Sequence, residues 1–179
     1  MAFSSRIAGA ENVAPEMRAA FEEGTQAGLE ALGVKGAEMV QEFIVTPYGA
    51  LPPAVAFGNL AASIVANFVR EATMCTEFIG VSPSVGADVY AAPVETGSRP
   101  HMPPPSALLP WIQKKFGVED EKQALSLAFA IAKSMKKKGT QGHEMFSRTL
   151  VDLEPLAPEA LEKSMAIAFV AHGFTGGTL

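Results

Sequence analysis

The sequence has a single cysteine, Cys75, and long apolar runs are missing as well. One cysteine excludes an intrachain disulfide and any metal site built from several thiolates. No run of roughly 18 or more apolar residues occurs, so the sequence predicts no membrane-spanning helix. The first residues, MAFSSR, lack the charged start and apolar run of a signal peptide. We therefore expect a protein that is made in the cytoplasm and stays or assembles there.

The short motifs of common enzyme classes are also absent. The sequence contains no nucleophile elbow, phosphate-binding loop, dinucleotide fingerprint or zinc-protease motif. His101, His143 and His172 are far apart in the chain and share no helical face with carboxylates, which favours surface or packed histidines over a metal site. We expect no catalytic residue, no cofactor and no metal. A small enzyme with an unrecognised site remains an alternative.

The chain has no excess of positive charge, since its net charge is −5. Its overall charge therefore argues against a nucleic-acid-binding protein. The charge is nevertheless uneven. Residues 1–100 hold eleven acidic and five basic side chains, whereas residues 101–150 hold four acidic and eight basic ones. Lysines crowd one predicted helix end, at Lys133, Lys136, Lys137 and Lys138. The helix dipole accounts for them in a monomer, while contact with DNA phosphates defines a second alternative, a DNA-contacting module.

What the sequence does contain is enough apolar content, 48% of 179 residues, for one domain with a substantial core. A helix is predicted to begin at Pro15 and to end at Gly33, followed by a helical piece over residues 35–45. Residues 60–71 and 75–81 have the β-branched and aromatic content of strands. A helix ending at Gly117 is predicted with Pro110 in its first turn, after a tighter turn over residues 105–109. Further helices are predicted over residues 120–139, 144–150 and 158–171. We expect a flexible arm over residues 1–14, a single domain over 15–172 and a flexible tail over 173–179.

The clearest helix signal lies in residues 120–139. Asp120 followed by Gln123 fits a variant of the capping box, and Gly139 provides a stop. Apolar residues recur with helical spacing and predict a buried stripe of Leu125, Ala128, Phe129, Ala132 and Met135. On this prediction Phe129 is a core residue.

The stretch from residue 89 to residue 105 has five prolines in seventeen residues and separates a strand-rich part from a helical part. Proline cannot donate the backbone hydrogen bond that pairs one strand with another, and Gly97 permits a turn. One interpretation of this stretch is therefore a rigid connector. The other interpretation is a contact loop, because a stiff loop loses little entropy on docking. We hypothesise that residues 95–105 contact a neighbouring subunit, with Glu95, Arg99 and His101 as the candidate side chains.

The same stretch, VYAAPVETGSRPHMPP, resembles a signature of the tail-component family of long-tailed bacteriophages. That family comprises small head–tail joining or tail-completion proteins, and its signature contains tyrosine-alanine, valine-glutamate and glycine-threonine-arginine-proline-histidine. The later segments are similar in order: a short helix with a central tryptophan over 104–117, an alanine-rich helix with a basic end over 124–139, and an aromatic at Phe146. The chain departs from the pattern at Pro110, in the loop over 47–59 and in its longer last helix.

The resemblance implies an α+β domain with an N-terminal helix, a small antiparallel sheet and C-terminal helices packed on one side of the sheet. It implies a non-enzymatic virion protein that forms a ring, a hexamer, in the neck between the head connector and the tail tube. The role would be tail completion or tail termination, after assembly in the host bacterial cytoplasm. Its partners would be further copies of itself, the head connector or adaptor protein, the tail tube protein and the packaged DNA, with no membrane. Because the lysines gather at one helix end, we also hypothesise that Lys133, Lys136 and Lys137 line the channel or face an acidic neighbour.

Overall fold

The computed structural model describes residues 2–6, 14–49, 51, 58–71, 74–83 and 86–174. The predicted α+β class is confirmed. In chain order the elements are β1 (Ala2–Arg6), α1 (Pro15–Val45), α2 (Asn59–Ala62), β2 (Ile64–Glu71), β3 (Met74–Val81), α3 (Asp88–Thr96), β4 (Gly97–Ser98), α4 (Pro105–Phe116), α5 (Glu121–Lys138), β5 (Thr140–Gln141), α6 (Met145–Leu153), the 3-10 helix η3 (Glu154–Leu156) and α7 (Ala157–Ala171).

The chain forms two compact units, where the sequence was expected to form a single domain over residues 15–172. Unit 1 comprises Met1–Val40, Ile64–Gly80 and Phe146–Leu179, and unit 2 comprises Gln41–Ser63 and Val81–Met145. Unit 1 carries twelve acidic and six basic side chains, and unit 2 carries seven acidic and eight basic ones. The excess of negative charge therefore lies in unit 1. The helices α4 and α5 belong to unit 2.

The sheet of unit 1 has the strand order β1-β3-β2. β1 pairs antiparallel with β3, so that Ala2 lies opposite Phe78 and Arg6 opposite Met74. Part of the expected flexible arm is thus a strand. The prediction failed because these five residues have no period-two pattern, and the edge of β3 supplies the pairing. Residues 7–13 of that arm and residues 175–179 of the expected tail lie outside the described residues.

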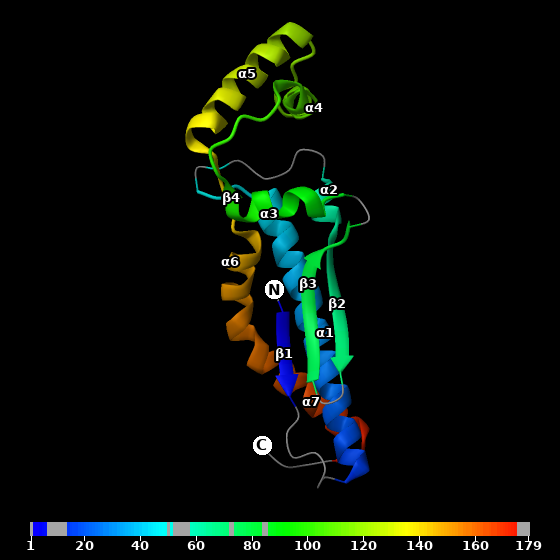
Figure 1. Cartoon of the computed structure of the whole chain (residues 1–179). Coiled ribbons are helices and arrows are strands. Elements are labelled where there is room, and N and C mark those ends of the chain that lie inside the picture. The colour runs from blue at the N-terminus through cyan, green and yellow to red at the C-terminus, as the bar shows by residue number, and fades with distance from the viewer. Residues whose placement is uncertain are drawn as a thin grey trace. The chain divides into compact units, whose positions relative to one another are not determined.

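Helix α1 runs unbroken from Pro15 to Val45, so the predicted end at Gly33 was wrong. A side chain at Gly33 would collide with the carboxyl group of Glu77 on β3, and one at Gly24 would lie 2.6 Å from the Cα atom of Met165 on α7. Each glycine costs a helix about 1 kcal/mol relative to alanine. Here the cost is offset by close packing of α1 on the sheet and on α7, elements that Figure 1 shows beside α1.

Two further expectations are corrected by the local structure. The predicted strand over 60–71 begins only at Ile64, because α2 precedes it. Pro110 was expected in the first turn of its helix, but α4 already begins at Pro105 and Pro110 lies inside it. Pro110 and Ser106 are both exposed, so solvent can satisfy the Ser106 carbonyl that a proline cannot bond. Residues 88–92 belong to α3.

In unit 2, α4 and α5 pack against each other around a small apolar core. Its buried members are Ile112, Ala124 and Ala128. The predicted cap of α5 is confirmed, because the Gln123 backbone N–H donates to Asp120 Oδ1 at 2.7 Å. Partly buried apolar side chains complete this core: Leu108, Leu109, Trp111, Val118 and Ile131.

The predicted buried stripe of α5 is only partly correct. Ala124, Ala128 and Ala132 are fully buried at helical spacing, but Phe129 is 52% exposed and Leu125 is 38% exposed. The reason is that α5 packs chiefly against α4, through a narrow row of alanines that lets the helices approach closely. Side chains beside that row remain open to solvent.

Candidate functional site

The two ends of the α4–α5 hairpin are joined by a short antiparallel ribbon of β4 and β5. Gly97 lies opposite Gln141, and Ser98 lies opposite Thr140. The hydroxyl oxygens of Ser98 and Thr140 are 2.8 Å apart, which adds a side-chain hydrogen bond across the ribbon. This β4–β5 ribbon fixes where the hairpin begins and ends.

Glycines allow the two strands of the ribbon to meet. Gly97 has φ 77° and ψ −176°, and Gly139 has φ 70° and ψ −157°, a region that is essentially restricted to glycine. A side chain on Gly139 would also collide with the Ser98 carbonyl oxygen, and one on Gly142 would lie 2.8 Å from the Gly97 nitrogen. The backbone contacts leave no space for any other residue type at these positions.

Glu95, one of the three candidate contact residues, lies at the base of this ribbon. Its carbonyl oxygen accepts a hydrogen bond from the Glu144 backbone N–H at 3.0 Å. The neighbouring Val94 carbonyl accepts from the His143 backbone N–H at 2.8 Å. Glu95 is half-buried, so its position is part of the frame that holds the loop.

The other two candidates, Arg99 and His101, are exposed on the loop that leaves the ribbon. The His101 backbone N–H donates to the Met135 carbonyl at 3.3 Å, and His101 Nδ1 lies 2.9 Å from the Arg99 carbonyl oxygen. The loop therefore runs beside the last turns of α5. Two candidate sites that the sequence treated separately, the stiff loop and the lysine cluster, meet at one place.

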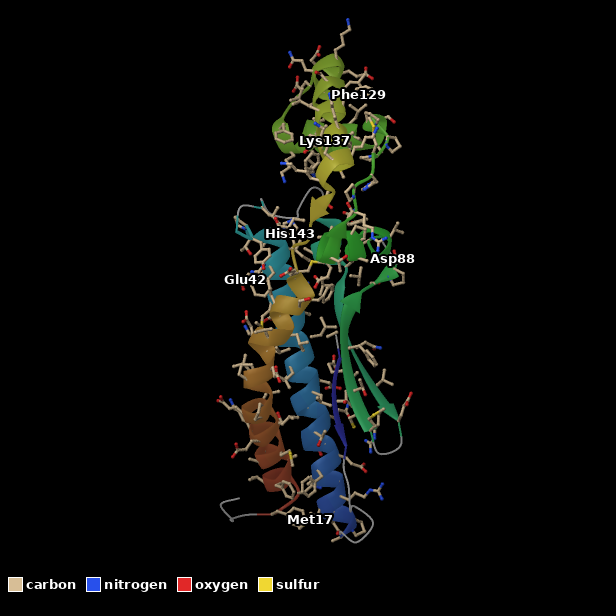
Figure 2. All side chains as sticks on the ribbon, turned by 60° about the vertical axis from the view of Figure 1, so that its left-hand side comes forward. Met17, Glu42, Asp88, Phe129, Lys137 and His143 are labelled. Atoms are coloured by element: carbon tan, nitrogen blue, oxygen red, sulfur yellow. The ribbon has the colours of Figure 1, made fainter. Side chains whose placement is uncertain are left out.

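An open pocket of about 660 Å³ lies at this meeting point. Its apolar lining comes from the loop and from α5, and three lysines complete it. Figure 2 labels two members of this set, Phe129 and Lys137, both on α5. We call it the lysine pocket, and its lining residues are Met102, Phe129, Ala130, Lys133, Lys136 and Lys137. Lys138, the fourth residue of the predicted cluster, does not line it.

The sequence carried a signal for this pocket that we misread. Phe129, Lys133, Lys136 and Lys137 are spaced as i, i+4, i+7 and i+8, which places them on one face of a helix. Because Phe129 was assigned to the buried core, this helix face was not recognised as a surface that combines an apolar ring with basic side chains. Met102 gave no periodic signal, since its place depends on the path of the loop.

A carboxyl group with a perturbed pKa lies elsewhere, in unit 1. Burial, together with a smaller contribution from the nearby carboxylate of Glu30, raises the pKa of Glu77 to about 7. Glu77 is 2% exposed and lies against Gly33 of α1. Because Glu77 is packed between helix α1 and the sheet, we interpret its raised pKa as a consequence of packing. Among the described residues, no three His, Cys, Asp or Glu side chains come close enough to hold a metal ion.

Phe129→Ala should therefore have little effect on stability. We expect a loss below about 1 kcal/mol in a urea melt followed by Trp111 fluorescence, because the ring is half exposed and buried truncations alone cost about 3–5 kcal/mol. Ile112→Ala, which truncates a fully buried neighbour in α4, is the matched control and should cost about 2–5 kcal/mol. Equal losses for the two variants would show that the Phe129 side chain is part of the core.

Comparisons of the chain with family models, with curated proteins and with solved structures found no match. No helix in the described part of the chain combines the length and apolar content needed to cross a membrane.

Proposed function

We propose that the chain is a non-enzymatic structural protein of a bacteriophage virion that forms a ring in the neck and joins the head connector to the tail tube. The ring would be a hexamer, and its role would be tail completion or tail termination. The proposal begins from the resemblance of residues 89–104 and the segments after them to the phage tail-component family.

One structural observation carries this proposal furthest. Apart from Phe146, which belongs to unit 1, the segments that bear the resemblance are consecutive elements of unit 2, namely α3, β4, the loop over residues 99–104, α4, α5 and β5. The β4–β5 ribbon ties their two ends together, and the hairpin core holds α4 on α5.

The exposed part of this substructure suits a fixed contact between proteins. Its loop is stiffened by proline and anchored by the bond from His101 to Met135, so docking it loses little conformational entropy. Arg99 supplies a planar group with several donors, and arginine is enriched at interface cores. Met102 of the same loop lines the lysine pocket together with Phe129 and the lysines.

The lysine pocket also favours a second candidate function, contact with DNA phosphates. Lys133, Lys136 and Lys137 lie on one exposed face, as phosphate binding requires. Titration with short duplex DNA at increasing salt tests this candidate. A steep loss of affinity with salt supports DNA contact, and no binding at low salt removes it.

The experiment for the main proposal is complementation of a phage whose copy of this gene has been disabled. Without the protein, filled heads and tails should accumulate unjoined, and the parent gene should restore complete particles. The double variant Arg99→Ala with His101→Ala should fail to restore them, although its stability should stay within about 0.5 kcal/mol of the parent. Complete infectious particles in the absence of the protein would refute the neck function.

Lys122→Ala with Gln113→Ala provides a matched control for that variant, because both side chains are exposed in the same unit and lie outside the loop. It should restore particles as well as the parent does. If the Arg99 and His101 variant also restores them, the loop is only a connector, whatever the function of the whole protein.

A further inference from the structure

The lysine pocket combines two properties that a helix end alone does not explain. Lysines in the last turns of α5 complement the helix dipole, which is sufficient reason for their charge. The dipole gives no reason for Phe129 and Met102 to be exposed beside them, at 52% and 47%. An exposed aromatic flanked by cations suits a partner that presents apolar side chains next to carboxylates. Phosphates alone would leave the apolar lining uncovered.

The outer face of α7, in unit 1, has this composition. The opposite face of α7 packs on α1, where Met165 and Leu161 contact Gly24 and Gly28. The outer face is exposed along its length, and Ile167 and Val170 on it are 63% and 61% exposed. At helical spacing it presents, from its N-terminal to its C-terminal end, Glu159, Glu162, Lys163, Ala166, Ile167 and Val170, so that two carboxylates outnumber one lysine in its N-terminal half.

The order of groups on the two helices is complementary. Along α5 the face runs from apolar Phe129 to basic Lys137, whereas along α7 it runs from acidic Glu159 to apolar Val170. If the two helices lie antiparallel, the lysines meet the glutamates and the phenylalanine meets the aliphatic end. Phe129 and Lys137 are eight residues apart, as are Glu162 and Val170, so both pairs span about 12 Å at 1.5 Å per residue.

We propose that the lysine pocket of one copy binds the outer face of α7 of a second copy of this chain, an inference that rests on the proposed ring. The net charges of the two units favour a second copy of the chain as the partner. Unit 1, which contains α7, has six more acidic than basic side chains, and unit 2, which contains the pocket, has one more basic than acidic. The contact joins two different surfaces of the same molecule. Contacts of this kind repeat from copy to copy and generate a closed ring when the rotation closes.

Charge exchange between the two surfaces tests the contact. Lys133→Glu with Lys137→Glu, the pocket variant, and Glu159→Lys with Glu162→Lys, the α7 variant, each place like charges in every contact. Each variant alone should self-associate about 100-fold more weakly than the parent in sedimentation equilibrium. Mixed in equal amounts they should assemble again, because each reversed surface then finds a partner of opposite charge on the other variant.

Lys35→Glu with Lys122→Glu is the matched control, since it changes the net charge as much as the pocket variant does and lies outside both surfaces. It should assemble like the parent. Circular dichroism on every variant verifies that the fold is retained.

Four outcomes would overturn the contact. Variants that assemble as the parent does would show that the ring uses other surfaces. A mixture that stays dissociated would show that the two surfaces do not meet. If reversal of the lysines abolishes binding of short duplex DNA and leaves the mass of the assembly unchanged, the pocket binds phosphates. A parent chain that is itself monomeric refutes the ring, and the contact with it.

Discussion

Glu77→Gln should stabilise the protein at about pH 8 by up to about 3 kcal/mol and have almost no effect at about pH 4.5. The carboxyl group of Glu77 is 2% exposed, and its Oε2 atom has no hydrogen-bond partner among the described residues. Burial, with a smaller contribution from the nearby Glu30 carboxylate, raises its pKa from 4.5 to about 7. Glutamine keeps the shape of the protonated acid and cannot ionise.

The direction follows from proton binding in the two states. Between pH 4.5 and about pH 7 the folded protein keeps the Glu77 proton while the unfolded chain has lost it. Stability therefore falls as pH rises through this window, and the glutamine variant escapes the loss. Urea melts followed by circular dichroism measure the free energy of unfolding of the parent and of the Glu77→Gln variant at both pH values.

Glu30→Gln is the control for the Glu77 experiment. It should stabilise in the same direction by less, because the Glu30 charge is the smaller of the two causes. Equal stability of the parent and the Glu77→Gln variant at about pH 8 would mean that solvent or a cation reaches the Glu77 carboxylate.

Gly139→Ala should lower the stability of unit 2 by about 3 kcal/mol or more. Gly139 has φ 70° and ψ −157°, a conformation that costs other residues about 1–3 kcal/mol. The added methyl group would also collide with the Ser98 carbonyl oxygen, a backbone atom that can move only if the β4–β5 ribbon opens. Trp111 is the only tryptophan of the chain and lies in α4, so its fluorescence reports this unit in a urea melt.

Gly117→Ala provides the matched comparison. Gly117 also has a positive φ, 65°, but no atom lies within 4 Å of the position that its Cβ would take. The substitution should cost only about 1–2 kcal/mol, the price of a left-handed conformation for alanine. If both variants lose the same amount, the close approach of β4 and β5 contributes nothing, and the ribbon does not hold the hairpin.

The sequence predicted those elements whose signals are local. Helix α5 followed from its apolar spacing, from Asp120 at its start and from Gly139 at its end, and the structure places it at Glu121–Lys138. Strand β3 followed from its β-branched and aromatic content. These signals depend on the backbone and on near neighbours, which the sequence contains in full.

The failures share a different cause, which is contact with distant residues. Gly33 reads as a helix stop, yet Glu77 of β3 lies against it and α1 continues. Ala2–Arg6 form a strand only because β3 offers an edge. Phe129 fits a buried stripe by spacing, and its exposure depends on how narrowly α4 covers α5.

The candidate site shows the same division. Arg99, His101 and the lysines were identified one by one from residue type and spacing. The pocket that the lysines form with Met102 and Phe129, next to the loop that carries Arg99 and His101, required the path of that loop from the β4–β5 ribbon past Met135. That path is set by three glycines and a few backbone hydrogen bonds, which no local pattern encodes.

The central claim is that copies of this chain form a closed ring. The most direct measurement is the mass of the purified protein in solution by native mass spectrometry, combined with electron microscopy of the same sample viewed end-on. The account predicts a discrete assembly of six copies with a central channel, and dissociation when salt screens the lysine pocket. A chain that remains a monomer at every concentration tested, with no annular particles in the images, would contradict it.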